Sequence, residues 1–140
     1  MPSKDMIGRV LSTGSATVSA ERVQAFAKAL GDPNPEYATV APPTYPIAFM
    51  AEAMSGGMNT FLELGLNFMT LVHGEQEFEY VRPLRIGETL TLTGRIADVY
   101  EKDTSSATME FYVREMDWRD TDGEPVVLER FTMIVRAKKD

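Results

Sequence analysis

The sequence predicts an α+β fold in which one long antiparallel sheet wraps around a single buried helix. From about residue 68 onward, apolar and polar residues alternate with a period of two, in runs longer than the usual strand. Residues 47–54, in contrast, are apolar nearly all round, with Glu52 as their one charged side chain. A helix without a polar face is buried on most sides, so the sheet has to cover it.

The first element is a short strand near residues 16–18, and an amphipathic helix follows it. Ser19 is a typical N-cap, and Gly31 supplies the C-terminal stop. Between them runs one apolar stripe, made of Val23, Phe26, Ala27 and Leu30. Residues 32–37 are expected to be neither helix nor central strand, because two prolines remove backbone donors. A second group of prolines leads into the buried helix, which Gly56 and Gly57 end.

Period-two alternation predicts strands in the second half, in runs at residues 75–80, 89–96, 107–114 and 127–136. In the third run the odd-numbered residues from Ala107 to Val113 form the apolar face, which leaves Arg114 on the wetter face. Asp122 and Gly123 mark a hairpin turn before the last strand. One long antiparallel sheet folded round one helix is the hot-dog arrangement.

Length and composition suit one globular domain spanning residues 1–140, with 44% apolar and 25% charged residues. The lack of cysteine excludes disulfides and thiolate metal ligands, and one histidine makes a protein-held metal unexpected. We expect a cytoplasmic protein with no membrane partner, because neither a signal peptide nor a membrane-length apolar run occurs. A net charge of -7 argues against nucleic-acid binding. We interpret Arg82 and Arg85 as two exposed loop arginines.

The most informative segment follows the amphipathic helix. Gly31, Asp32, Asn34 and Pro35 match in place the pattern Gly-Asp-x-Asn-Pro-(aliphatic)-His. The segment therefore resembles the signature of the MaoC-like (R)-specific enoyl-thioester hydratases and (3R)-hydroxyacyl-thioester dehydratases, with Tyr37 at the position of the family histidine. Residues 41–48 look like the lead into that family's central helix. Residues 73–78 and 82–88 look like its N-terminal-type, FAS1-like dehydratase branch.

The resemblance implies a site for an acyl thioester, carried by CoA or by acyl-carrier protein, and it implies no cofactor. In the family an Asp and a His share the proton transfer, which assigns the principal acid–base role to Asp32 and the holding of the loop to Asn34. Tyr37 is not a ready base at neutral pH, because a phenol has a pKa of about 10. It remains a candidate hydrogen-bond donor or acid.

Two further groups of residues are candidates for the same site. His73 is the single histidine of the chain. Either it replaces the missing base from a neighbouring strand, or it is a hydrogen-bonded strand or interface residue. The N–H groups of Thr44, Tyr45 and Ile47 are candidate donors to the enolate oxygen, since helix N-termini present unpaired donors. The nearby prolines equally well serve only to set the entry angle of the buried helix.

Three functions stay open. The first is a hydro-lyase, a dehydratase or hydratase acting through Asp32. The second is a non-catalytic acyl-binding subunit that pairs with a His-containing hot-dog chain, as domains of this type without the His often do. The third is a thioesterase in which Glu52 is base or nucleophile; Glu52 otherwise points outward or pairs across a subunit boundary. Dimerisation, as homodimer or heterodimer, is expected in each case, because a lone hot-dog leaves a sheet edge unpaired.

Overall fold

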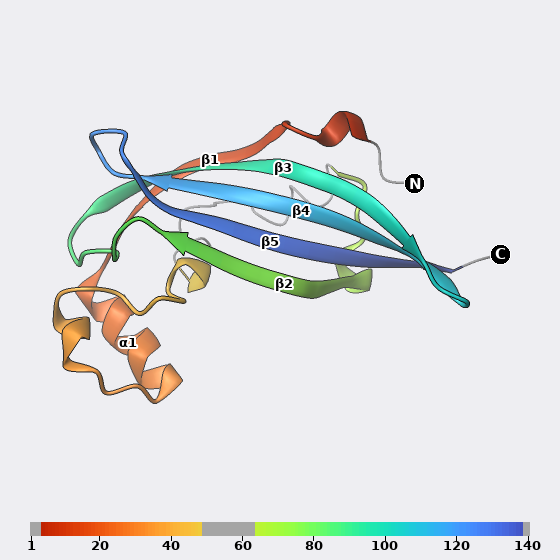
Figure 1. The fold of residues 1–140 in the computed structure, drawn as a ribbon. Coiled ribbons are helices and arrows are strands. Elements are labelled where there is room, and N and C mark those ends of the chain that lie inside the picture. Colours follow the sequence, from red (N-terminus) through yellow and green to blue (C-terminus); the bar gives the residue numbers. More distant parts are fainter. Residues whose placement is uncertain (1–3, 49–63, 139–140) are drawn as a thin grey trace.

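The computed structural model describes residues 4–48 and 64–138. Its strands are β1 (Val10–Thr17), β2 (Leu71–Tyr80), β3 (Thr89–Asp103), β4 (Ala107–Arg119) and β5 (Pro125–Lys138). Its helices are α1 (Ala20–Leu30) and the short 3₁₀ turns η1 (Lys4–Met6), η2 (Pro35–Ala38) and η3 (Phe68–Thr70). The strands form one antiparallel five-stranded sheet in the order β1-β3-β4-β5-β2 (Figure 1). The predicted α+β class is confirmed.

Helix α1 begins and ends at the predicted residues. The Ser19 side chain accepts a hydrogen bond from the Arg22 N–H, and Gly31 ends the helix with a left-handed φ of 69°. Val23 and Ala27 pack into the core and Phe26 packs against it, so these three residues of the predicted apolar stripe face one end of the sheet (Figure 1). The fourth, Leu30, is 52% exposed, so the stripe ends one turn earlier than predicted. Within the described residues, no helix is both long enough and apolar enough to cross a bilayer.

The predicted buried helix is described only at its start. Residues 46–48 are helical, and the rest of the predicted segment, with Glu52, lies outside the described residues. The same holds for Gly56 and Gly57, which we expected to end it.

Strand β1 differs from the prediction, because it runs over Val10–Thr17 instead of the few residues near 16–18. Its sequence is rich in Ser, Thr and Gly, so no apolar alternation marks it. The strand forms because its backbone pairs in register with β3, from Thr17 opposite Thr89 back to Ser12 opposite Gly94.

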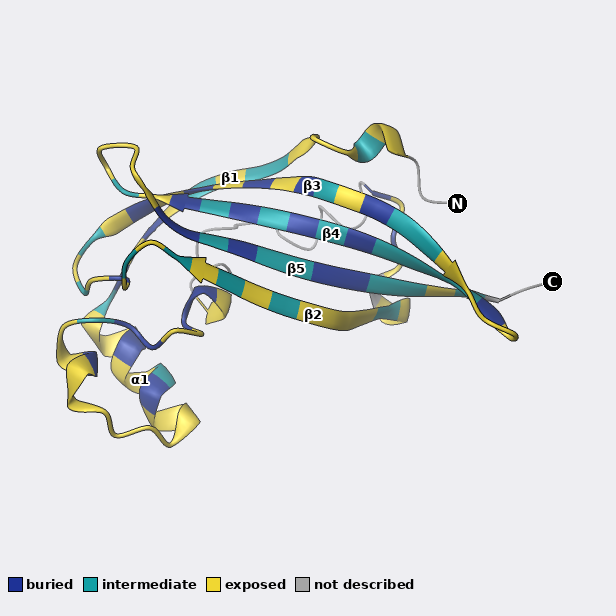
Figure 2. Ribbon diagram, in the orientation of Figure 1, coloured by how far each residue is buried: buried dark blue, intermediate teal, exposed yellow. Residues whose placement is uncertain are grey.

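The face assignment of β4 was wrong from Tyr112 onward, although Ala107 is buried as predicted. From Tyr112 onward the even-numbered residues point into the core, and Tyr112, Arg114, Met116 and Trp118 are buried. Register explains the result, because Trp118 lies opposite the inward-facing Leu92 of β3 and Val127 of β5. Apolar residues occupy both faces of this strand, so the alternation of apolar and polar residues alone did not identify the inner face. Figure 2 shows the alternation of buried and less buried residues along β3 and β4.

The inner face of the sheet packs two apolar clusters. One contains α1 residues, Leu90, Trp118 and Val127, and the other contains Ile96, Val99 and Met133. Phe131 packs against both clusters.

Two charged side chains share this inner face. Arg114 is 2% exposed, and its Nη2 donates to the Ser12 hydroxyl over 2.9 Å. Glu129 is fully buried and accepts hydrogen bonds from Gln76 Nε2 at 2.6 Å and Trp118 Nε1 at 3.2 Å. Gly94 leaves room for the arginine, since a Cβ there would lie 2.6 Å from Ser12 Oγ and 3.3 Å from Arg114 Nη2.

Burial raises the pKa of Glu129, and the hydrogen bonds from Trp118 and Gln76 and the charge of Arg114 only partly oppose it. The folded chain thus holds this proton more tightly than the unfolded chain. The free energy of unfolding therefore falls as pH rises from about 4.5, the ordinary carboxyl value, through the raised pKa.

We expect Glu129→Gln to lose this pH dependence, because glutamine does not titrate. Urea unfolding of both proteins between about pH 4.5 and 8 measures the effect. The stability of the wild type should fall relative to that of the variant as pH rises. A constant difference across the range would contradict the buried-carboxylate explanation, provided circular dichroism shows that the variant is folded.

Candidate functional site

The site begins at the C-terminus of α1, where Gly31 fixes the direction of the chain. The Gly31 N–H donates to the Lys28 carbonyl, and the Asp32 N–H donates to the Ala27 carbonyl, as in a Schellman cap. Asp32 is therefore the first residue beyond the left-handed glycine. Its Oδ1 accepts a hydrogen bond from the Asn34 N–H at 3.2 Å, which closes a tight turn.

Asn34 holds the next part of the loop, as the resemblance implied. Its Oδ1 accepts a hydrogen bond from the Glu36 N–H at 3.0 Å and caps η2. The prediction that residues 32–37 contain no helix was wrong at this point, because a 3₁₀ turn starts at Pro35. A proline fits there, since the first position of a helix needs no N–H donor.

Tyr37 closes the loop by bonding back to Asp32. Its hydroxyl donates to Asp32 Oδ2 over 2.7 Å, and its ring is buried in the core cluster that includes Val23 and Ala27. The hydrogen bond to Asp32, together with burial, raises the pKa of the Tyr37 hydroxyl above its ordinary value of about 10. Gln24 of α1 donates from Nε2 to the Tyr37 carbonyl at 2.8 Å, which fastens the loop to the helix.

These residues line a cavity of about 470 Å³ between α1 and the loop. Asp32 is exposed to solvent, yet it is one of the lining residues together with Asn34 and Tyr37. The helix contributes Gln24 and Lys28, which our reading of the sequence missed. They are four residues apart on a helix that ends at Gly31, so they share the face that leads to Asp32. The four-residue spacing of Gln24 and Lys28 was the signal in the sequence that could have identified them as lining residues.

The three candidate oxyanion donors do not line this cavity. The Tyr45 N–H donates to the Pro42 carbonyl at 3.0 Å, and the Ile47 N–H donates to the Thr44 carbonyl at 3.3 Å. Two of the three donors are thus already used within the turn. The buried Tyr45 ring packs edge-to-face on Phe26, with centroids 5.5 Å apart.

His73 lies away from the loop on β2, as the sequence indicated. Its ring contacts Phe131 with centroids 4.4 Å apart, and it does not line the cavity of Asp32. The structure thus brings Asp32, Asn34 and Tyr37 together and leaves His73, Thr44, Tyr45 and Ile47 elsewhere. The roles assigned to these residues stay predictions.

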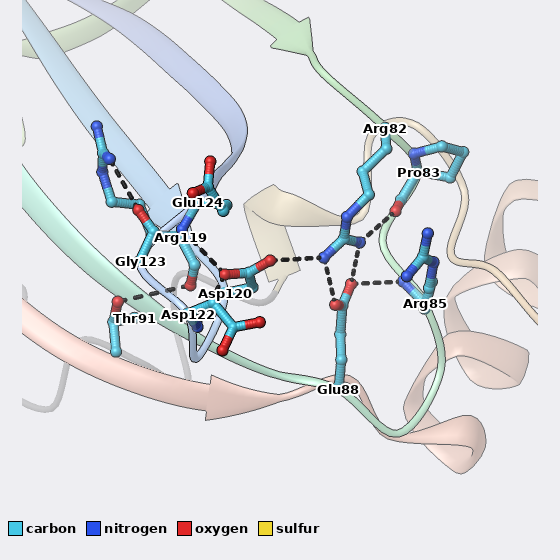
Figure 3. Close-up of polar contacts among 10 residues, drawn as sticks. All are labelled: Arg82, Pro83, Arg85, Glu88, Thr91, Arg119, Asp120, Asp122, Gly123 and Glu124. Atoms are coloured by element: carbon cyan, nitrogen blue, oxygen red, sulfur yellow. Dashed lines mark hydrogen bonds and ion pairs between the residues drawn. The ribbon is translucent and has the colours of Figure 1, made fainter.

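Arg82 is not the exposed loop arginine that we expected. Its Nη1 and Nη2 donate to Glu88 Oε1 and Oε2 at 2.9 and 2.8 Å, and Nη2 lies 3.6 Å from Asp120 Oδ2 (Figure 3). Burial raises the pKa of Glu88, but the bonds from Arg82 and from the Arg85 N–H outweigh it, so the pKa is lowered. The bidentate pair with Glu88 fixes the geometry of the β2–β3 connection. The contact with Asp120 joins that connection to the β4–β5 hairpin. Arg85 is exposed, as predicted.

Solved structures share this fold at low sequence identity. The HadBC (3R-hydroxyacyl-ACP dehydratase) complex of Mycobacterium tuberculosis gives a TM-score of 0.71 at 19% identity, covering 90% of this chain and 96% of that one. The ChsH1-ChsH2 complex of the same organism gives 0.72 at 19% identity, covering 92% and 85%. A MaoC-like dehydratase gives 0.72 at 20% identity, covering 93% of this chain and 42% of that one. These likenesses confirm the hot-dog fold.

Some proteins share more of their sequence with this chain than these solved structures do. The UPF0336 protein of Streptomyces avermitilis is 33% identical over 135 residues, covering 88% of this chain and 87% of that protein. The UPF0336 protein of Thermobifida fusca is 33% identical over 148 residues, covering 96% and 94%. Residues 5–129 match the family described as FAS1-like, dehydratase domain region. The chain therefore belongs to the FAS1-like dehydratase domain family and has its MaoC-like hot-dog fold.

Proposed function

We propose that this chain is an acyl-thioester-holding subunit of a hot-dog dehydratase, and that a partner chain with the loop histidine supplies the acid–base chemistry. The observation that carries the proposal is the 2.7 Å hydrogen bond from the Tyr37 hydroxyl to Asp32. It occupies the carboxylate that would have to work as the base or acid.

Hydration of an enoyl thioester needs a group that accepts a proton near neutral pH and a second group that delivers one. Tyr37 does neither well, because its raised pKa keeps the phenol protonated far above pH 7. Both oxygens of Asp32 accept hydrogen bonds from the same loop, one from Tyr37 and one from the Asn34 N–H. His73, the single histidine, lies on β2 outside this cavity. The loop keeps its shape but has no histidine.

Family membership supports the proposed substrate class. The family match supports a 3-hydroxyacyl or enoyl thioester of CoA or of acyl-carrier protein as the bound group. Pairing is supported by the solved structures of similar fold, two of which are described as complexes of differently named hot-dog chains, HadBC and ChsH1-ChsH2. A thioesterase role for Glu52 stays a prediction without an observation in its favour.

The first test is an activity assay. We expect the purified chain to hydrate crotonyl-CoA no faster than buffer. We expect activity when the chain is co-expressed with the His-containing hot-dog chain of its own genome. Within that complex, Asp32→Asn in this chain should change kcat less than about threefold, whereas the same change in the partner's loop should abolish turnover. Hydration by this chain alone, lost in Asp32→Asn, would contradict the proposal and identify an enzyme.

The second test restores the family residue. Tyr37→His sets an imidazole beside Asp32, where the pair resembles the family dyad, and Tyr37→Phe is the matched control because it also removes the phenol. We expect Tyr37→His to give measurable hydration of crotonyl-CoA and Tyr37→Phe to give none. Activity of the phenylalanine variant would show that the phenol had silenced Asp32 and that the site needs no histidine, which would contradict the proposal. Equal binding of butyryl-CoA by both variants, measured by calorimetry, would show that the cavity is intact.

A further inference from the structure

We propose that Lys28 binds the carbonyl oxygen of the thioester from the helix side of the cavity, and that it thereby orients the acyl group with its third carbon beside Asp32. The inference rests on the proposed function, in which this cavity holds the acyl end of the thioester. It adds a residue that touches the ligand and names the ligand group that it touches. Lys28 precedes Gly31, the first residue of the family pattern, so the resemblance assigned it no role.

Lys28 is the cation of the cavity. Among the described residues that line it, two have charged side chains: Lys28, from the last turn of α1, and Asp32, from the loop. Lys28 is exposed, and its side chain forms no ion pair or hydrogen bond within residues 4–48 and 64–138. Its ammonium group is therefore available to a ligand that enters the cavity.

The neighbouring donors of the cavity hold the loop. Gln24 Nε2 donates to the Tyr37 carbonyl at 2.8 Å, and the Tyr37 hydroxyl donates to Asp32 Oδ2 at 2.7 Å. The Asn34 N–H donates to Asp32 Oδ1 at 3.2 Å. A charged donor also forms a stronger hydrogen bond to a carbonyl oxygen than a neutral amide does. Lys28 is therefore the strongest donor that these lining residues offer to a ligand.

The two charges of the cavity favour one orientation of a thioester. The carbonyl oxygen carries partial negative charge, so Asp32 repels it and Lys28 attracts it. A hydroxyl on the third carbon can donate to Asp32, because each carboxylate oxygen accepts a second hydrogen bond beyond the one from its own loop. The phosphates of CoA are separated from the acyl group by the pantetheine arm. The carbonyl oxygen is therefore the acceptor that Lys28 meets when the acyl end lies in the cavity.

A purely structural role is the alternative for Lys28. A cation in the last turn of a helix is stabilised by the helix dipole, and Lys28 occupies such a position in α1. That interaction acts on folding and is blind to the ligand. A contact with the carbonyl oxygen, in contrast, makes the effect of a substitution depend on whether the ligand has a carbonyl group. The two roles therefore differ in a binding measurement.

The test compares two ligands that differ only in the carbonyl group. Calorimetry measures the binding of butyryl-CoA and of S-butyl-CoA, its thioether analogue, to the wild type, to Lys28→Met and to Lys28→Arg, with circular dichroism to check folding. We expect Lys28→Met to weaken butyryl-CoA binding at least about fivefold, because a hydrogen bond to a charged group is lost. Binding of S-butyl-CoA should change less than about twofold. Lys28→Arg keeps a charged donor, so it should retain most of the butyryl-CoA affinity.

Lys4→Met is the matched control, because it removes the same charge from η1, at the end of the sheet away from α1 (Figure 1). It should leave the affinity for both ligands unchanged.

Three outcomes would overturn the inference. Equal losses for both ligands in Lys28→Met would assign the contact to another group of CoA, and an unchanged affinity for butyryl-pantetheine, which lacks the phosphates, would identify that group as a phosphate. No loss for either ligand would assign Lys28 to the stability of α1. Both results leave the proposed function standing. Failure of the wild type to bind butyryl-CoA at all would overturn the inference and the proposed function together.

Discussion

The hydrogen bond between the Tyr37 hydroxyl and Asp32 links the core of the molecule to the loop of the candidate site. Tyr37 is anchored by its ring in the core, while its hydroxyl holds the carboxylate of a loop that is otherwise exposed. The left-handed Gly31 aims the chain at this point, Asn34 caps the following turn, and Gln24 ties the loop back to α1. These contacts therefore hold the loop in a fixed position relative to α1 and so define the shape of the cavity between them. The same contact that orders the loop also occupies Oδ2 of the Asp32 carboxylate.

The inner face of the sheet joins apolar packing to a buried polar cluster. Arg114 and Glu129 are both nearly or fully excluded from solvent, and each is held by neighbours on other strands. Taking a charge out of water costs several kcal/mol, which hydrogen bonds and opposite charge only partly return. Such residues contribute little net stability, but their bonds connect β1 to β4 and β2 to β5 in one register. A shifted strand would leave a buried charge without its hydrogen bonds, so the cluster disfavours alternative registers.

Local features could be read from the sequence, and features that depend on distant partners could not. Both caps of α1, the Asp32 loop, the β-strands of the second half and the position of His73 on a strand follow from local patterns. The inward face of β4 did not, because Met109, Phe111 and Val113 are as apolar as Tyr112, Met116 and Trp118. Burial of Arg114 depends on Ser12, about a hundred residues away, and that of Glu129 depends on Gln76. In the same way, the sequence predicted an exposed Arg82, because its contacts with Glu88 and Asp120 exist only in the folded chain.

Gly94 is the single glycine of β3, and the guanidinium of Arg114 crosses the strand at that position. A side chain there would displace either Ser12 or the arginine. The residues at positions 12, 94 and 114 are consequently linked in descent: a lineage that acquires alanine at 94 is expected to have replaced Ser12, whose hydroxyl lies nearest, or to have lost the arginine at 114. Among related chains, the residue at 94 should therefore foretell the residues at 12 and 114, although the three belong to different strands.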